Sequence, residues 1–263
     1  MTELKNVEIE RGGPIATVTL NRPEKANALN YAHLADLESA ALSFADDAET
    51  RVVIFPGAGR PFCSGADLTD PREEYRGSYL QRRNAQRIGQ RAILALYKMS
   101  QITIAAWEGG AMGGGACVAT ALDFRVGSEG CFIQYPEVEI GVNLNWKGLP
   151  LITRLVGPAR AKRLVVGGER MHAETLRDWG VLDRVVPSEE LMSAAREMAD
   201  FYARRPPIAA QMIKESINAL SMGADEAIMH MDFDQNLLSG GTEDATEAAR
   251  SYLAKTEPHF KGN

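Results

Sequence analysis

Short apolar runs dominate the first half of the chain and predict a β-rich architecture. Residues 7–10 and 15–20 alternate apolar with polar or small side chains on either side of Gly12-Gly13, a pattern typical of an antiparallel hairpin. Later runs predict four more strands, at residues 51–55, 102–106, 123–126 and 131–134. The segment Pro136–Gly141, which follows the last run, is expected to be a turn.

Helical spacing marks two segments between these strands. Asn30 can cap the first helix, whose recurring apolar residues are Leu34, Leu37, Ala41 and Leu42. A long helix is expected over Ser78–Met99, preceded by a polar segment, residues 70–77, that we expect to be mobile. The residues expected on the buried face of the long helix are Leu80, Ile88, Ile93, Leu94 and Leu96.

The order of these elements predicts the fold class. Strand, strand and helix repeat with a similar loop after each β run, which favours an α/β spiral of ββα units over a doubly wound sheet. From Pro150 onward the pattern becomes helical, broken only at 181–186; the expected helices are 151–155, 159–166, 173–179, 189–203, 207–220, 225–239 and 243–255. We therefore divide the chain into a ββα-spiral core, 1–200, and a helical C-terminal portion, 201–263. The apolar faces of these helices fit packing against another subunit or within the chain.

The glycine-rich stretch Trp107–Ala119 lies between an apolar run and a run of small residues that predicts the start of a helix. A turn of this kind presents backbone N–H groups which, with the helix dipole, can hold a negative charge. A dinucleotide fingerprint would need glycine at Val118, and a phosphate-binding loop would need Lys followed by Ser or Thr after the last glycine. Neither is present, so the stretch is either another kind of anion site or a tight turn.

Composition narrows the function classes. The chain of 263 residues is 45% hydrophobic and 24% charged, as in an ordinary globular protein. A net charge of -6, without basic clusters interleaved with aromatics, argues against nucleic acid. No apolar run reaches the roughly 18 residues of a membrane span, and Met1 leads into polar residues instead of a signal peptide. We expect a cytoplasmic protein with no membrane partner.

The thiols and imidazoles show no spacing typical of a metal site. Cys63, Cys117 and Cys131 have neither pairing nor metal-ligand spacing, so we expect reduced thiols. The four histidines, His33, His172, His230 and His259, form no ligand motif. No metal is expected.

Five motifs, in the same order, resemble those of the enoyl-CoA hydratase/isomerase (crotonase) superfamily. They are Asn21–Leu29, Phe62–Leu68, the glycine stretch, Tyr135–Gly141 and Pro258–Gly262, and together they span nearly the whole chain. The resemblance implies a crotonase-like spiral of ββα units with a helical C-terminal trimerisation portion. It also implies an acyl-CoA substrate, no separate cofactor, and assembly as a homotrimer or a dimer of trimers.

In this family the thioester carbonyl is held between two backbone N–H groups, which the resemblance assigns to Ala66 and Gly114. Enolate chemistry places negative charge on the thioester oxygen, and each preorganised donor stabilises it by roughly 3–4 kcal/mol. The alternative is that the two loops are merely tight turns that close the fold.

Family analogy also places residues along the coenzyme A moiety. Those expected beside its adenosine and pantetheine are Lys25, Ala26, Leu29, Ser64, Asp67 and Leu68. Lys25 is either paired with a phosphate or simply solvated. Phe260 and Lys261 are similar to residues that reach the coenzyme A of a neighbouring subunit, and a frayed tail is the alternative.

The resemblance assigns proton transfer to Glu137. A carboxylate in an apolar pocket has its pKa raised into the range useful to a general acid and base. The alternative is a solvated acid in a turn. Glu139, two residues on, is expected to point away.

One departure from the family pattern bears on the reaction. Hydratases of the family usually carry a second Glu three residues after the oxyanion-hole glycine, where this chain has Cys117. A thiol holds and activates water poorly, so Cys117 is expected to be a small packing residue. Asn143, Asn145 and Trp146 are expected to shape the acyl pocket.

The sequence therefore predicts an enzyme that adds water to, or shifts, the double bond of an enoyl-CoA. Ala66, Gly114 and Glu137 are its expected catalytic groups. Two alternatives remain open: C–C bond hydrolysis or retro-aldol cleavage of an acyl-CoA, and a non-catalytic acyl-CoA binder.

Overall fold

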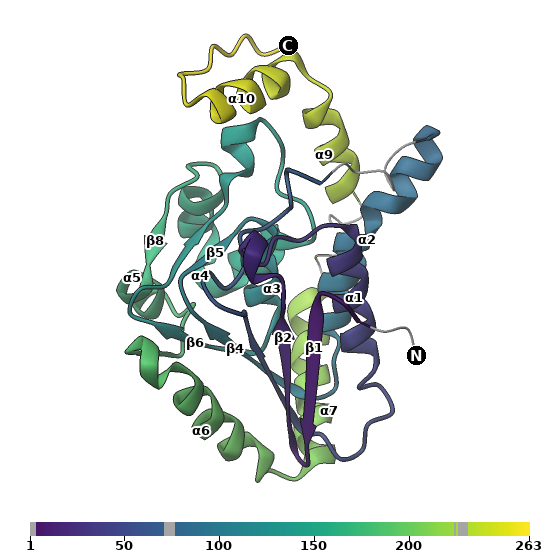
Figure 1. Ribbon diagram of the computed structural model, residues 1–263, viewed down its shortest axis with the longest axis vertical. Helices are drawn as coiled ribbons and strands as arrows, with labels where there is room; N and C mark the ends of the chain where they lie inside the picture. Colours follow the sequence, from purple (N-terminus) through teal and green to yellow (C-terminus); the bar gives the residue numbers. More distant parts are fainter. Residues whose placement is uncertain (1–3, 71–76, 224, 226–230) are drawn as a thin grey trace.

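The computed structural model, which describes residues 4–70, 77–223, 225 and 231–263, contains two sheets that meet near the middle of the molecule (Figure 1). The large sheet has the order β1 (Val7–Gly12), β2 (Ile15–Leu20), β3 (Val52–Pro56), β4 (Ile102–Trp107), β6 (Phe124–Ser128) and β9 (Arg184–Val186). The small sheet has the order β5 (Gly110–Met112), β7 (Phe132–Gln134) and β8 (Met171–His172). Strands β1 and β2 form the expected antiparallel hairpin, and the remaining pairs of the large sheet are parallel.

Alternation along the parallel strands divides the core between the two faces of the large sheet. Val53 and Phe55 of β3 belong to a cluster shared with the helices α1 (Tyr31–Leu42), α2 (Tyr79–Tyr97) and α3 (Gly114–Ala121). Val52 and Ile54 belong to the cluster on the opposite face, which is covered by α6 (Leu191–Ala203). The sheet is thus buried on both sides, which is why its central strands read as continuous apolar runs.

Side chains satisfy free N–H groups at the start of the first two α-helices. Asn30 caps α1 by accepting from the His33 N–H at 2.9 Å, and Ser78 and Gln81 form a capping box at the start of α2. The other helical segments are η1 (Pro23–Lys25), η3 (Pro136–Ile140), α4 (Gly148–Val165), α5 (Ala173–Asp178), η4 (Ser188–Glu190), α7 (Pro207–Met222), α9 (Asp232–Gly240) and α10 (Glu243–Ala254). Helix α4 breaks at Gly157, whose φ is 77°, matching the two helices expected over 151–166.

The ββα repeat is confirmed by the connections between the sheets. Strand β4 of the large sheet leads to β5 of the small sheet and then to α3, and β6 leads in the same way to β7 and η3. Each of these two units therefore contributes one strand to each sheet. The turn between the two strands of a unit lies at the junction of the sheets, where the glycine-rich segments gather.

Two of the residues expected on the buried face of the long helix are not buried. Leu80 is 65% exposed because the first turns of α2 extend beyond the body of the molecule (Figure 1), and Leu94 is only half-buried. Leu42, at the end of α1, is also exposed. Most of the polar segment expected to be mobile, and part of the helix expected over 225–239, lie outside the described residues.

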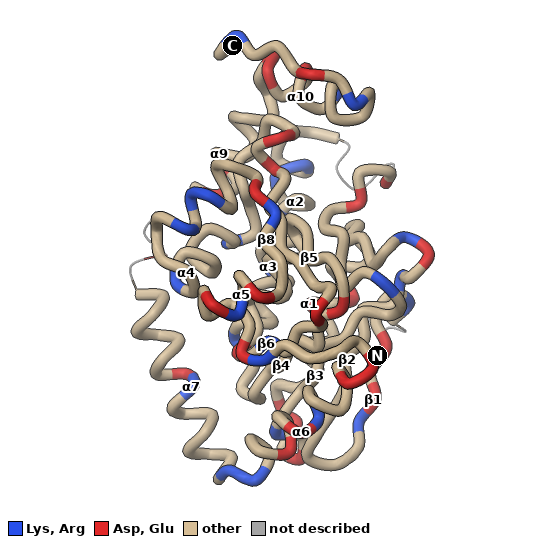
Figure 2. The backbone as a smooth tube through the Cα atoms, turned by 90° about the vertical axis from the view of Figure 1, so that its left-hand side faces the viewer, with Lys and Arg blue, Asp and Glu red and all other residues tan. Residues whose placement is uncertain are grey.

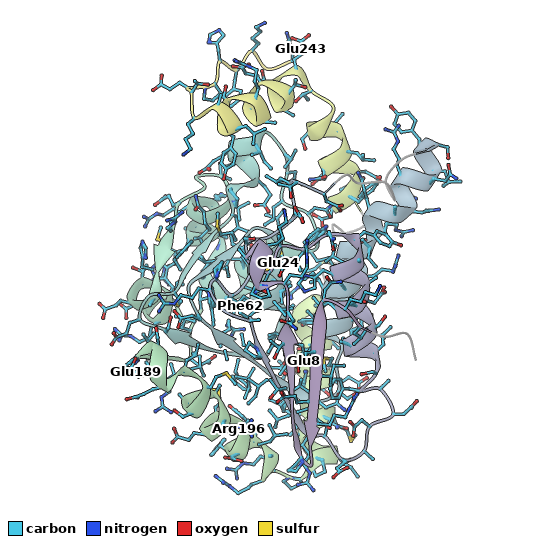
Figure 3. All side chains as sticks on the ribbon, in the orientation of Figure 1. Glu8, Glu24, Phe62, Glu189, Arg196 and Glu243 are labelled. Carbon is cyan, nitrogen blue, oxygen red and sulfur yellow. The ribbon has the colours of Figure 1, made fainter. Side chains whose placement is uncertain are left out.

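Helix α6 runs across residues 200 and 201, where the sequence places the end of the core. Because α6 covers the large sheet, the more peripheral helices begin after Ala203. Glu243, at the start of α10, lies at the end of the molecule remote from α6, which carries Arg196 (Figure 3). The division into two domains stays a prediction.

Acidic and basic residues are interspersed along the backbone in the view of Figure 2. No helix of the described part is long and apolar enough to cross a membrane. Nor do the described residues bring together three or more His, Cys, Asp or Glu side chains that could hold a metal ion.

Candidate active site

A cavity of about 660 Å³ lies where the loop after β3, the start of α3, η3 and the C-terminal helices meet. Ala66, Gly114 and Glu137 all line it, although they are far apart in the sequence. Residues of α9 and α10 complete its wall, so the C-terminal helices cover the site. The structure therefore brings the three expected catalytic groups into one space.

Two glycine-rich loops approach each other at this cavity. The Cys63 N–H donates to the Gly110 carbonyl at 3.1 Å, and the Met112 N–H donates back to the Cys63 carbonyl at 3.0 Å. Gly65 sits so close to the second loop that a Cβ there would lie 2.5 Å from the Met112 carbonyl oxygen and 3.4 Å from the Gly114 nitrogen. Only glycine fits this approach, which brings the peptide preceding Ala66 beside the start of α3.

The amides of Ala66 and Gly114 are not used in the fold. Leu29 pairs with the Ala66 strand segment through the Gly65 carbonyl and the Asp67 N–H, which leaves the Ala66 N–H out of the pairing. Gly114 is the first residue of α3, so its N–H has no acceptor within the helix. Neither amide is among the donors of the described backbone hydrogen bonds. Two free donors beside a cavity are what an oxyanion requires.

The first loop is held by residues that the sequence analysis did not single out. The buried Asn27 side chain donates to the carbonyls of Ala58, Pro61 and Phe62 at 3.0, 3.0 and 3.2 Å. Figure 3 shows Phe62 in the body of the molecule. Asn27 has a φ of 55°, in the left-handed region that asparagine tolerates. The tolerance of asparagine for a positive φ is the sequence signal that could have marked Asn27 as a residue of a tight turn.

Asp67, which the resemblance places beside coenzyme A, supports this loop. Its carboxylate accepts from Arg22 at 3.1 Å and from the Thr69 hydroxyl at 2.7 Å, and the side chain is buried. Burial alone would raise the pKa of Asp67, but the hydrogen bonds from Thr69 and Arg22 outweigh it, and the pKa is lowered. Asp67 is therefore ionised and paired.

Glu137 faces the start of α3 from the helical turn η3. Its Oε1 would lie 2.5 Å from a Cβ at Gly113, whose φ is 48°, so the carboxylate rests against a backbone that must be glycine. Its Oε2 is enclosed and has no hydrogen-bond partner within the described structure. Burial chiefly, together with the charge of Glu139, raises the pKa of Glu137 from 4.5 to about 7. Glu139 is exposed, as expected.

A pKa near neutrality lets one carboxyl group act as both acid and base. Glu137 is the only carboxylate among the described residues that line the cavity. Perturbed carboxylates in clefts are typical of functional sites.

Cys117 is fully buried on α3, and its Sγ lies 3.9 Å from the Asn145 carbonyl oxygen. Burial, with the negative charges of Glu137 and Asp232, raises the pKa of the Cys117 thiol well above its usual range. The thiol therefore stays protonated, in agreement with a packing residue. Cys63 and Cys131 are also buried and free.

The segment after η3 contains residues that line the cavity and a residue that contacts α9. Asn145 and Trp146 line the cavity. Asn143, expected to shape the pocket, faces α9 instead, because its side-chain amide donates to Gln235 at 3.0 Å and its carbonyl accepts from Asn236 at 2.7 Å. Its role is to attach α9.

Asp232 is a further buried residue of α9 that no sequence pattern marked. Its Oδ2 accepts from the Lys147 N–H at 2.9 Å, and its Oδ1 has no partner among the described residues. Burial raises the pKa of Asp232 to about 6, against the opposing effects of the Lys147 backbone and charge. The hydrogen bond from Lys147 to Asp232 fixes the start of α4. Because the two residues are far apart in the chain, only the folded structure shows this contact.

The other residues expected beside coenzyme A lie in surroundings that differ from one residue to the next. Leu68 lines the cavity and is exposed, and the exposed Lys25 donates to the Thr69 hydroxyl at 3.4 Å. The Ser64 N–H donates to the Ala26 carbonyl at 3.1 Å, which joins the two motifs. The Leu29 side chain is buried in the core.

The tail residues Phe260 and Lys261 do not line the cavity. Asp244 of α10 accepts from the Lys261 N–H at 2.7 Å and from the Gly262 N–H at 2.8 Å. The tail is thus attached to α10 and not frayed, while Phe260 remains 51% exposed.

Comparison with known proteins shows the family of the chain. The family model described as enoyl-CoA hydratase/isomerase matches residues 10–263. A short-chain-enoyl-CoA hydratase of Clostridium acetobutylicum is 31% identical over 257 residues, 96% of each chain. A carnitinyl-CoA dehydratase of Salmonella enteritidis is 33% identical over 266 residues, which cover 98% of this chain and 99% of the relative.

Solved structures show the same fold. An enoyl-CoA hydratase from Bacillus anthracis superimposes with a TM-score of 0.77 at 30% identity, over 98% of this chain and all of that one. An enoyl-CoA hydratase from Mycobacterium avium subsp. paratuberculosis gives 0.87 at 24% identity, over the same shares of the two chains. The chain therefore belongs to the enoyl-CoA hydratase/isomerase, or crotonase, family of enzymes that act on coenzyme A thioesters.

Proposed function

We propose that this enzyme moves a proton on an unsaturated acyl-CoA through a thioester enolate. The thioester oxygen accepts from the Ala66 and Gly114 N–H groups, and the carboxyl group of Glu137 exchanges the proton. The observation that carries the proposal is the shared cavity, which is lined by two residues with unused amides and by a carboxylate whose pKa is raised to about 7.

The reaction begins with the Glu137 carboxylate taking a proton from the α carbon of a β,γ-unsaturated thioester. The electron pair of that C–H bond moves into the C–C bond, and negative charge collects on the oxygen between the two amides. Return of the same proton to the γ carbon completes a double-bond migration. Water addition to an α,β-unsaturated thioester passes through a different enolate held by the same two amides: the water oxygen bonds to the β carbon, the water loses one proton, and one proton is delivered to the α carbon.

Cys117 favours the migration. Two carboxylates can hold and activate a water molecule, and here the second position is a protonated thiol. A single base suffices for migration because the proton that leaves is the one that returns.

Product analysis tests the proposal. We expect 3-hexenoyl-CoA to be converted to 2-hexenoyl-CoA, with crotonyl-CoA hydration as the rival activity. Replacement of Glu137 by Gln should lower turnover roughly 10²–10⁴-fold and leave coenzyme A thioester binding intact. Full turnover by this variant would refute the assignment. Cleaved acyl products would support the C–C lyase alternative, and bound but unchanged thioesters would support a binder.

A further inference from the structure

The indole of Trp146 rests on two glycines from different helices. A Cβ at Gly114, the first residue of α3, would overlap the six-membered ring of Trp146. A Cβ at Gly89, in the middle of α2, would overlap its five-membered ring. The indole therefore occupies space between α2 and α3 that any side chain at either glycine would fill.

Gly89 has no other evident purpose in the fold. Glycine in the interior of a helix is unfavourable, because it gains backbone freedom on unfolding. Gly89 nevertheless lies, buried, in the helix α2. The Trp146 ring fills the space that a side chain at position 89 would need, and this accounts for a glycine there.

The backbone around Trp146 is fixed in an uncommon conformation. Trp146 and Lys147 have φ values of 57° and 60°, a region that bulky residues seldom adopt. The Trp146 N–H donates to the Asn145 side chain at 2.6 Å, and the Lys147 N–H donates to Asp232 at 2.9 Å. These contacts hold the indole in place from both sides of the turn.

Trp146 also stands beside the reacting atoms of the proposed function, on which this inference rests. Gly114 supplies an amide to the thioester oxygen, and the same residue supports the indole ring. Glu137 borders the neighbouring Gly113. An acyl chain that leaves the carbonyl toward α2 therefore meets the face of Trp146 within its first few carbons.

We infer that Trp146 is the wall that limits the acyl group to short chains, and that Gly89 is the positioning residue that makes room for it. Removal of the indole opens an apolar space between α2 and α3. Each further methylene placed in that space strengthens binding by up to about fourfold, the equivalent of about 0.8 kcal/mol.

The test is calorimetric binding of saturated acyl-CoA thioesters of four to twelve carbons to the intact protein, which needs no turnover. We expect the wild type to bind butyryl-CoA more tightly than decanoyl-CoA. Trp146→Ala should reverse this order and bind decanoyl-CoA at least tenfold more tightly than the wild type does. Trp146→Leu should change the order in the same direction, by less, and serves where the alanine variant is poorly folded.

Two further variants sharpen the result. Trp179→Ala removes an indole at the end of α5, outside the cavity, and should leave the length preference unchanged. Gly89→Ala should weaken the binding of every thioester while Trp146 is present. In the Trp146→Ala background the same substitution should have little effect on binding. An unchanged decanoyl-to-butyryl ratio in both Trp146 variants overturns the inference. A wild type that binds no thioester of any length overturns the proposed function instead.

Discussion

Ionising Glu137 inside the folded protein costs free energy, and replacing it by Gln should make the enzyme more stable at alkaline pH. The pKa of Glu137 is 4.5 in an unfolded chain and about 7 in the fold. One pKa unit corresponds to about 1.4 kcal/mol, so the ionised carboxylate lowers the free energy of unfolding by about 3 kcal/mol. Because the folded pKa is the higher one, the protonated carboxyl group contributes its full share of stability below pH 4.5, and this share is lost as the pH rises through 7.

Denaturant unfolding of the wild type and of Glu137→Gln, followed from pH 5 to pH 9, measures the effect. The stability advantage of the variant should grow by about 2.5 kcal/mol over this range and level off above pH 8. Glu189→Gln, which changes an exposed acid outside the cavity, is the control and should follow the wild type closely. An advantage of Glu137→Gln that stays constant from pH 5 to pH 9 would refute the raised pKa and, with it, the dual acid and base role.

Three other outcomes follow from the same geometry. For double-bond migration, kcat/KM should rise with pH through about 7 as Glu137 becomes the carboxylate. Glu139→Gln should move the midpoint of this rise to lower pH, because the charge of Glu139 raises the pKa of Glu137. A midpoint that Glu139→Gln leaves unchanged would contradict this coupling. Gly113→Ala should lower kcat at least 100-fold, because a Cβ there would lie 2.5 Å from Oε1 of Glu137 and the φ of Gly113 is 48°. Gly130→Ala, where a Cβ would meet open space, is the control and should keep the wild-type kcat in the same assay. Light scattering should give the mass of a trimer or of a dimer of trimers, since α7 exposes Ile208, Met212, Ile213, Ile217 and Leu220, and a monomer would count against this assembly.

The sequence predicts the parts of the site that local chemistry determines. The strand runs, the Asn30 cap and the glycine-rich turns each depend on residues close together in the chain, and the structure has them where the pattern indicates. Glu137 and Gly114 both line the cavity, each held in its own short turn, and their catalytic roles stay predictions.

What the sequence did not predict depends on contacts between distant residues. Gly89 and Trp146 are 57 positions apart, and nothing near either residue indicates that one replaces the side chain of the other. Asp232 and Asn143 acquire their roles only when α9 packs over the site. Leu80 has the spacing of a buried residue, but the helix that carries it extends beyond the core it would have joined.

Hydrogen–deuterium exchange at the α carbon of butyryl-CoA tests the enolate and its base most directly. This saturated thioester can lose and regain an α proton but cannot be hydrated or isomerised, so exchange in D₂O isolates the proposed step. The wild type should introduce deuterium at the α carbon, measured by mass spectrometry, and Glu137→Gln should introduce it at least 100-fold more slowly while binding butyryl-CoA with similar affinity. Binding without exchange by the wild type, or equal exchange by the variant, would contradict an enolate formed between Ala66 and Gly114 and served by Glu137.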